Sequence, residues 1–488
     1  MKIGSLPIWK GYRLLLTGAL WSGVVFLATP AFAQLNATEK EDIGFTSLQT
    51  RLGVLMPTGT SVSVSQIEAP DGSSNYRPNT SLFSGKTFAF PSGGTTGISS
   101  HANTVGQYLY GANSLAASIG ATANSDTVTV FEVNNWLQSG FLNYNTASAL
   151  PLVESNDIQN HSWIGSTNNT TTDTQILRRM DYAIARDDFV AVFGLNNGSG
   201  TTLPNLMGQS YNGITVGLSN GNHSRGTTTI DGTGRTKPDI VVPTSTTSWA
   251  TATVSSAAGL LIGVARATPN LTNAQTSEMV KALLMAGATK TESEFSGGWT
   301  HSSTQPLDAV YGAGELNIEN SYDILTAGEF NASSSTLAGK TGWDFGTASA
   351  SSTNYFFFDL TSGETNVSFT AVLTWNRTVT ATDTQPGPGV SYNFTSIVPN
   401  LDLKLYNASG FTIGALLESS VSAVDNTELV YRTGMSPGRY ALAISSDTSG
   451  IDYGLAWVSQ VPEPGTISLL LIGALGIGFQ SLRRGRRS

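Results

Sequence analysis

Hydrophobic positions in the first two thirds of the chain follow two alternating patterns. Short runs rich in Val, Ile and Phe predict strands, and longer segments with apolar residues every three or four positions predict helices. The predicted strands are 58–69, 126–133, 158–164, 189–194, 213–218 and 240–242. The predicted helices are 101–116, 174–187, 250–265, 274–288 and 317–327, with a further helix starting at 134–139. This alternation predicts an α/β fold with a parallel sheet flanked by helices.

The pattern changes after a segment at 327–340 that is rich in Asn, Ser, Thr and Gly. Six short alternating segments follow, and each is a predicted strand: 355–360, 367–375, 401–406, 427–432, 438–445 and 453–458. Strands separated by turns, without helical periodicity, predict an antiparallel β-sandwich. We therefore expect an α/β domain at 34–329 and a β-sandwich accessory domain at 330–459.

Both ends of the chain have the composition of targeting segments. Residues 1–33 carry Lys2, Lys10 and Arg13, then an apolar run at 14–28 and Ala-Phe-Ala at 31–33. This order predicts a cleaved secretory signal peptide.

The last residues, 461–488, contain Pro-Glu-Pro at 462–464, a hydrophobic stretch at 467–479 and four arginines at 483–487. The hydrophobic stretch is short for a bilayer span, although flanking residues could extend it. The order of these features resembles the PEP-CTERM sorting signal of bacterial exported proteins. The resemblance implies a transient membrane anchor, an exosortase-type sorting enzyme as partner, and delivery to the cell surface or extracellular matrix.

Composition excludes several classes of function. The chain has no cysteine, which rules out disulfides and thiolate chemistry. Without both ends, seven of the 25 basic and one of the 34 acidic residues are lost, which leaves a net charge of −15. Such a surface repels nucleic acid. The metallopeptidase motif HExxH and the dinucleotide motif GxGxxG are both absent.

Four polar residues stand at ends of predicted strands or starts of helices. Glu68 ends the first strand, His101 opens a helix, Asn196 follows the apolar strand at 189–194, and Ser248 lies where a loop becomes a helix. Loops at the carboxyl ends of parallel strands share one edge of the sheet. Unpaired N–H groups at a helix start suit a serine nucleophile whose attack creates an oxyanion. An isolated serine there is more often a simple helix cap.

The segments around these residues resemble the motifs of subtilisin-type (subtilase) serine peptidases over about 58–327. The family's H-G-T-H-V-A-G is similar to His101-Ala-Asn-Thr-Val-Gly106, and its G-T-S-x-A-T-P to Thr246-Thr-Ser248-Trp-Ala-Thr-Ala252. Its G-N-x-G is similar to Leu195-Asn196-Asn-Gly198, and its K-P-D-I-x-A-P to residues 237–243. The order of acid, histidine, asparagine and serine also agrees.

The resemblance implies a serine endopeptidase with a subtilisin-like fold that acts on proteins or peptides and needs no cofactor. Ser248 would be the nucleophile, His101 the base and Glu68 the acid, and Asn196 would form the oxyanion hole with the Ser248 N–H. Ser162, Trp163 and Gly165, in the segment 160–165, would pair with an extended substrate. Loop Asp and Asn residues could bind structural calcium, but no loop has a diagnostic spacing and no metal ligand is assigned.

Three positions differ from the family pattern. The family has aspartate where Glu68 stands, so Asp71 is an alternative acid. Thr246 replaces a glycine, and Ala252 replaces a proline. A subtilase-fold surface or matrix protein with little or no catalysis therefore stays as the alternative function.

The remaining candidates are assigned structural or accessory roles. His161 lies in the expected substrate strand and is expected to be structural or to affect specificity. His223 and His301 stand in polar segments and are expected at the surface. The segment 330–459 resembles the bacterial pre-peptidase C-terminal type of sandwich, which implies a non-catalytic domain.

Overall fold

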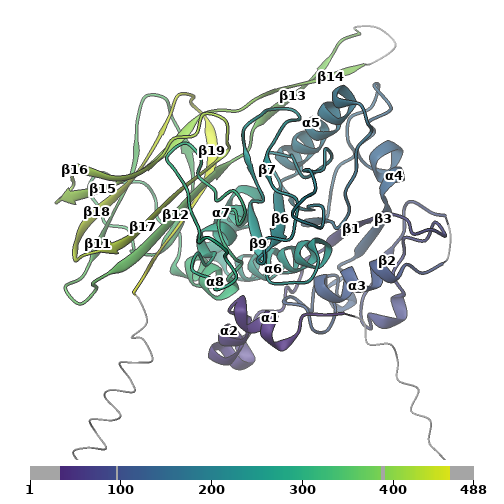
Figure 1. Cartoon of the computed structure of the whole chain (residues 1–488), viewed down its shortest axis with the longest axis horizontal. Helices are drawn as coiled ribbons and strands as arrows, with labels where there is room; N and C mark the ends of the chain where they lie inside the picture. Colours follow the sequence, from purple (N-terminus) through teal and green to yellow (C-terminus); the bar gives the residue numbers. More distant parts are fainter. Residues whose placement is uncertain (1–32, 95–96, 386–390, 462–488) are drawn as a thin grey trace, which may run out of the picture. The chain divides into compact units, whose positions relative to one another are not determined.

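The structure is a computed structural model that describes residues 33–94, 97–385 and 391–461. The expected signal peptide and sorting tail therefore lie outside the described residues, except for Ala33 and Val461. The described residues belong to one compact unit. Figure 1 shows a helix-flanked sheet followed along the chain by two layers of strands.

The first sheet has seven strands in the order β2-β3-β1-β4-β5-β6-β9, and every pair is parallel. The strands are β1 Val64–Glu68, β2 Phe88–Ala89, β3 Val128–Glu132, β4 Ile158–His161, β5 Val190–Gly194, β6 Ile214–Leu218 and β9 Ile240–Val242. The predicted parallel sheet is thus confirmed. Its carboxyl-terminal edge gathers the ends of β1, β4 and β5, which carry or precede the candidate site residues.

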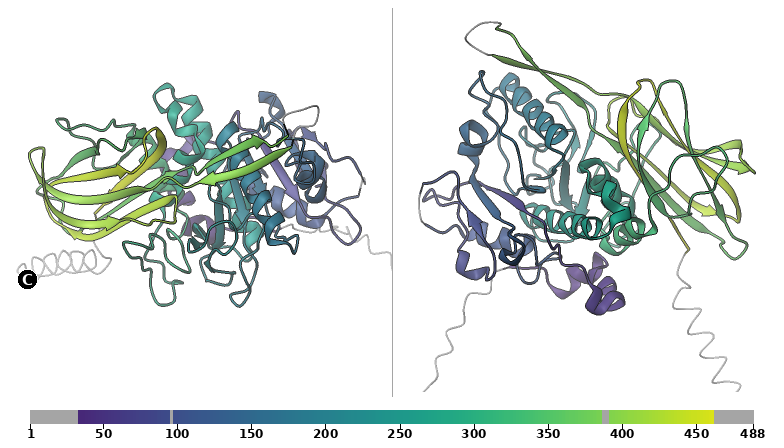
Figure 2. Two further views of the ribbon diagram at one scale, coloured as in Figure 1. Left: turned by 90° about the horizontal axis from the view of Figure 1, so that it is seen from above. Right: turned by 180° about the vertical axis from the view of Figure 1, so that it is seen from behind.

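Successive side chains of the central strand β5 enter different cores. Val190 and Val192 pack in one hydrophobic cluster with α6, and Ala191 and Phe193 pack in another with α5. Side chains of a strand alternate between the two faces of its sheet, so a continuous apolar run is required when helices cover both faces. The two views of Figure 2 show helices on both sides of the sheet.

The helix that starts beside Ser248, α6 Thr247–Ala267, is built mostly from Ala, Ser, Thr and Gly and is buried along most of its length. Such small side chains allow close packing against the sheet: a β-carbon at Gly259 would lie 2.4 Å from Ile119 Cδ1. Among the described residues, α6 is the one helix long and apolar enough to cross a bilayer, and 78% of its most apolar window is buried inside the protein. Its apolar character therefore reflects the core of the domain.

Two short helices precede the first strand, α1 Ala37–Asp42 and α2 Phe45–Leu52. The remaining helices follow the predicted pattern with shifted ends and are α3 Ser100–Leu109, α4 Val133–Asn135, α5 Thr170–Asp187, α7 Ser277–Gly287 and α8 Ile318–Ala327. Helix α3 ends seven residues before the predicted 116, and α4 continues as a π-helical turn, Trp136–Gly140. Trp136 is fully buried in this turn.

The second region is an antiparallel sandwich, as predicted. One sheet has the order β10-β19-β12-β17 and the other β11-β18-β15-β16. The strands are β10 Gly342–Ala348, β11 Asn354–Leu360, β12 Val367–Trp375, β15 Leu401–Ser409, β16 Thr412–Ser420, β17 Thr427–Met435, β18 Gly438–Ser446 and β19 Ile451–Gln460. The sequence pattern missed β10 and β16, and also a separate hairpin of β13 Thr378–Asp383 and β14 Tyr392–Ile397.

A common hydrophobic core and buried ion pairs connect the sandwich to the α/β region. Trp343 and Leu429 belong to the same hydrophobic cluster as α7. Arg377, just before β13, is 1% exposed and forms ion pairs with Asp181 of α5 at 2.6 Å and with Asp231 at 2.5 Å. The contact between the two regions is therefore a continuous buried core rather than a hinge between independent domains.

Candidate active site

Three side chains from distant parts of the sequence form a chain of hydrogen bonds. Glu68 Oε2 lies 2.7 Å from His101 Nδ1, and His101 Nε2 lies 3.1 Å from Ser248 Oγ. Glu68 is fully buried, whereas the side chain of His101 is 38% exposed. In this arrangement the neutral imidazole donates from Nδ1 and presents Nε2 to the serine hydroxyl, which is the geometry a general base needs.

Local structure explains the position of each member. Glu68 is the last residue of β1. His101 is in the first turn of α3, whose N-cap Ser99 accepts a hydrogen bond from the Ala102 N–H. Ser248 is the second residue of α6, where the main-chain N–H groups have no partner within the helix.

The structure places Glu68, and not the alternative Asp71, against the imidazole. Asp71 is exposed and its Oδ1 accepts from the N–H groups of Ser73 and Asn75 in a turn. Burial disfavours protonation of His101, but the charge and hydrogen bond of Glu68 outweigh it, so the pKa of His101 is raised above its usual value. These are the effects expected of a buried carboxylate that stabilises an imidazolium.

Two buried residues beside the acid were not singled out in the sequence. Gln66 Nε2 donates to Glu68 Oε1 at 2.7 Å, and the Tyr110 hydroxyl donates to Gln66 Oε1 at 2.6 Å. Gln66 lies two positions before Glu68, on the same face of β1, which was a signal available from the alternation of the strand. Tyr110 lies just after α3, and only the tertiary structure brings it to Gln66.

The backbone two residues before the nucleophile does not require a glycine. Thr246, where the resembling family has glycine, has φ −142° and ψ 153°, an extended conformation that any residue adopts. Ala252 is an ordinary buried residue inside α6. The Thr247 N–H is taken by Asn197 Oδ1 at 3.0 Å. Within the described part of the chain, by contrast, no acceptor contacts the Ser248 N–H.

Asn196 and Ser248 line the same small pocket. Its volume is about 90 Å³, and its lining residues are Ser162, Trp163, Ile164, Gly194, Leu195, Asn196, Asn197, Thr247 and Ser248. The Asn196 main chain is fixed by Ser224, which donates from its N–H to the Asn196 carbonyl at 2.8 Å and accepts the Asn196 N–H through Oγ at 3.0 Å. Asn196 therefore lines the same pocket as the nucleophile, and its main chain is held in place.

The expected substrate segment follows β4 directly. Ser162 Oγ donates to the Ser248 carbonyl at 2.9 Å and so ties this segment to α6. Trp163 is buried and donates from Nε1 to His161 Nδ1 at 3.2 Å. The Gly165 carbonyl already accepts the Leu206 N–H at 3.0 Å. Ile164, which is not among the residues expected to bind substrate, is the exposed member of this segment, at 43%.

The other histidines do not join the site. His161 is fully buried, and burial lowers its pKa to about 3. The expectation that His223 lies at the surface is wrong. It is fully buried, its Nδ1 accepts the Leu218 N–H at 3.0 Å, and its Nε2 donates to the Val310 carbonyl at 3.0 Å. The polar residues around His223 in the sequence did not indicate that its side chain is buried.

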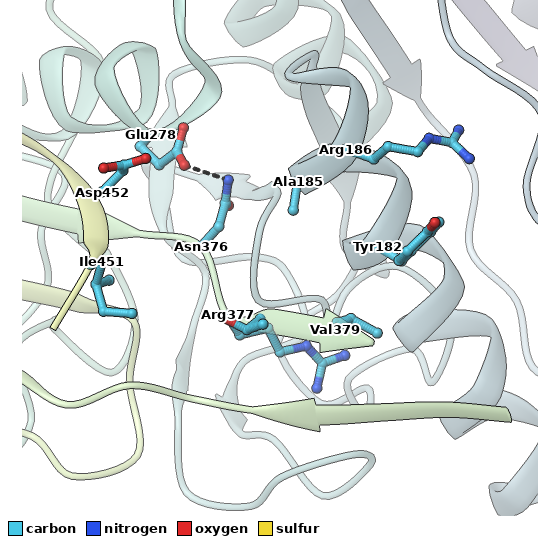
Figure 3. A pocket seen from close by; sticks show the side chains of 11 residues that line it. Tyr182, Ala185, Arg186, Glu278, Asn376, Arg377, Val379, Ile451 and Asp452 are labelled. Atoms are coloured by element: carbon cyan, nitrogen blue, oxygen red, sulfur yellow. Dashed lines mark hydrogen bonds between the residues drawn. The ribbon is translucent and has the colours of Figure 1, made fainter. Parts of the chain in front are cut away.

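A larger pocket, of about 290 Å³, lies where α5 and α7 meet the sandwich (Figure 3). Glu278 of α7 accepts from Asn376 Nδ2 at 2.6 Å there, and burial, with Asp188 nearby, raises the pKa of Glu278 to about 7. None of the predicted catalytic residues lines this pocket. Among the described residues, no group of three or more His, Asp or Glu side chains is placed to hold a metal ion.

Comparisons with known proteins give resemblance in structure only. No family model matches the sequence, and no curated protein matches it. The patellamide maturation protease PatA is 17% identical, with a TM-score of 0.36 over 55% of this chain and 98% of its own. The epidermin leader peptide processing serine protease EpiP from Staphylococcus aureus is 14% identical, with a TM-score of 0.37 over 58% and 80%.

Fervidolysin from Fervidobacterium pennivorans, a keratinolytic enzyme related to subtilisin, is 10% identical, with a TM-score of 0.36 over 88% of this chain and 82% of its own. At these identities and TM-scores the likeness does not by itself support an argument about activity. The case for a function therefore rests on the side chains around Ser248.

Proposed function

We propose that this chain is an exported serine endopeptidase that hydrolyses peptide bonds with Ser248, His101 and Glu68. The observation that carries the proposal is the hydrogen-bond chain from Glu68 through His101 to Ser248, at 2.7 and 3.1 Å, beside a pocket. A plain helix-capping serine needs neither an imidazole on its hydroxyl nor a buried carboxylate behind that imidazole.

The proposed reaction follows from these positions. His101 Nε2 takes the proton of Ser248 Oγ as Oγ attacks the scissile carbonyl, and Glu68 stabilises the imidazolium. The negative oxygen of the tetrahedral intermediate accepts from the Asn196 amide and the Ser248 N–H. His101 then gives its proton to the leaving amine, and water, activated by His101, hydrolyses the acyl-enzyme.

The pocket favours a small, uncharged side chain on the residue whose carbonyl is attacked. The volume of the pocket is only about 90 Å³, and none of its lining residues is ionisable. With peptide anilides that differ only at this residue, we expect kcat/KM for alanine to exceed that for phenylalanine or lysine by at least about tenfold. A preference for phenylalanine or lysine would contradict this assignment.

Export and cell-surface sorting are part of the proposal and rest on the two ends of the sequence. The predicted signal peptide and the tail with Pro-Glu-Pro and its arginines support them. Mass spectrometry of the protein recovered from its natural host would test them. Export with sorting predicts a start near residue 34 and loss of the arginine-rich end.

A fluorophosphonate probe separates catalysis from the alternative, a non-catalytic surface protein with the same fold. We expect the probe to label the wild-type chain, and we expect no labelling of the Ser248→Ala and His101→Ala variants. Ser245→Ala, an exposed serine three residues before Ser248, is the matched control and should be labelled normally. A folded wild-type chain that does not react with the probe would favour the alternative.

A further inference from the structure

The carboxylate of Glu68 uses both of its oxygens. Oε2 meets His101, and Oε1 accepts from Gln66 Nε2 at 2.7 Å. Glu68 and Gln66 are both fully buried, so water cannot replace the second hydrogen bond. The proposed mechanism uses only the first contact and leaves Gln66 without a role.

The amide of Gln66 has only one favourable orientation. Its Oε1 accepts from the Tyr110 hydroxyl at 2.6 Å, and its Nε2 also donates to the Ala102 carbonyl at 3.1 Å. A flipped amide would turn its oxygen toward the Glu68 carboxylate and the Ala102 carbonyl, which can only accept hydrogen bonds. These two acceptors determine which end of Gln66 faces the acid, and the Tyr110 hydroxyl holds the other end by donating to Oε1.

Tyr110 is itself held rigidly. It is fully buried, and its ring makes an edge contact with Phe83 at 5.0 Å between centroids. Burial, with the charge of Glu68 nearby, raises the pKa of its hydroxyl well above the usual value. The hydroxyl therefore remains a hydrogen-bond donor over the whole working range of pH.

We propose that Gln66 is the positioning residue of the triad acid and that Tyr110 holds Gln66 in place. Glutamate has one more rotatable bond than aspartate, so its carboxylate needs a second anchor to stay in line with His101 Nδ1. The contact of Gln66 with the Ala102 carbonyl fixes that anchor to the helix that carries His101. The inference rests on the proposed function, because it assigns Gln66 a role in the same triad.

The first experiment is a double-mutant cycle with Gln66→Leu and Glu68→Gln. In the wild-type background we expect Gln66→Leu to lower kcat about tenfold to hundredfold, with little change in KM. This loss is smaller than the factor of about 10⁴ expected when the triad acid itself is removed. In the Glu68→Gln background the further loss should be below about threefold. Equal losses in both backgrounds would overturn the proposal, since a merely structural role does not depend on the charge of Glu68.

Because Gln66→Leu could prevent folding, Tyr110→Phe provides a second test. It removes one hydroxyl and leaves the ring packing intact. We expect a smaller loss of kcat, about three- to tenfold, that again disappears in the Glu68→Gln background. Tyr453→Phe is the matched control, because that buried hydroxyl donates to Asp344 in the sandwich at 2.8 Å. Its kcat should equal that of the wild type, and an equal loss in both tyrosine variants would contradict the assignment.

A readout that does not need activity separates this inference from the proposed function. In the Ser248→Ala protein, the low-field proton resonance of His101 Nδ1–H reports its hydrogen bond to Glu68. We expect Tyr110→Phe to shift or broaden this resonance and Tyr453→Phe to leave it unchanged. If Tyr110→Phe shifts the resonance but the wild-type chain does not react with the fluorophosphonate probe, only the proposed function is overturned. A reactive wild type with an unchanged resonance would overturn the role of Gln66 and Tyr110.

Discussion

Buried acidic side chains occur in both the parallel sheet and the sandwich, but their neighbours differ. Glu68 at the end of β1 contacts a half-exposed histidine, which in turn contacts the hydroxyl of Ser248. Asp344 of β10 and Glu428 of β17 contact hydroxyl groups inside the sandwich, Tyr453 for Asp344 and Ser420 for Glu428. Burial raises the pKa of Asp344 to about 7 and that of Glu428 to about 9.

The difference shows that burial of a carboxylate does not by itself mark a catalytic site. In the sandwich the burial is offset only by neutral donors, so the neutral form of the acid is favoured near neutral pH. At the edge of the parallel sheet a titratable base can take up a proton next to the acid. The carboxyl ends of parallel strands provide such a place because their loops leave an opening.

The largest expected effect comes from removing the sandwich, which tests whether the two regions are separable at all. A chain that ends at residue 329 would leave Asp181 without Arg377 and would expose the side of α7 that packs on Trp343. Loss of one partner of a buried pair alone costs about 3–5 kcal/mol. We therefore expect no cooperative thermal unfolding of this shorter chain. Stability close to that of the full chain would show that the regions are independent.

The next effect contrasts acids from the two regions. We expect Glu68→Gln to lower kcat about 10⁴-fold, because the imidazolium loses its partner. Asp344→Asn and Asp71→Asn should change kcat by less than about twofold, since neither carboxylate contacts His101. Peptide hydrolysis by purified, folded variants measures this order. A larger loss in Asp71→Asn than in Glu68→Gln would move the triad acid to Asp71.

The pH dependence of activity sharpens the contrast further. Catalysis requires neutral His101, and its pKa is raised because the charge of Glu68 outweighs the effect of burial. The acid limb of kcat/KM should therefore have its midpoint above pH 6.5, the ordinary value for histidine. Activity is full above this midpoint and falls as the pH decreases through it. In Glu68→Gln the midpoint of the residual activity should be lower, and an unchanged midpoint would contradict the coupling.

The smallest effect is on stability in the sandwich. The pKa of Asp344 is raised from 3.8 to about 7, mainly by burial, so folding favours its protonated form. Protonated Asp344 therefore stabilises the wild-type fold fully below pH 3.8, and this stabilisation is lost as the pH rises to about 7. The Asp344→Asn variant has no carboxyl group to ionise and does not lose stability in this way. The melting temperature of the variant relative to the wild type should rise by a few degrees between pH 4 and pH 8. A difference in melting temperature that stays constant between pH 4 and pH 8 would contradict the raised pKa of Asp344.

Most of the fold was predictable because, where helices and strands alternate, the local spacing of apolar residues indicates how the elements pack. The run at 189–194 predicted β5, and its wholly apolar character predicted helices on both faces of the sheet. The missed strands lack this signal. β10 contains two glycines, and β13 alternates polar residues with only two small apolar ones, Val379 and Ala381, so the apolar signal of each strand is weak. β10 is paired with β19, which is distant in sequence, whereas β13 forms a hairpin with the neighbouring β14.

The sequence by itself determined the fold class and selected Glu68, His101, Asn196 and Ser248, because each follows a strand or opens a helix in a recognisable motif. Only the tertiary structure shows that Glu68 rather than Asp71 contacts His101, since both are acids within a few residues of the end of β1. It alone revealed the contacts of Gln66 and Tyr110 and the burial of His223. Tyr110 is 44 positions from Gln66 and Val310 is 87 positions from His223, and no local pattern of residues encodes contacts over such separations.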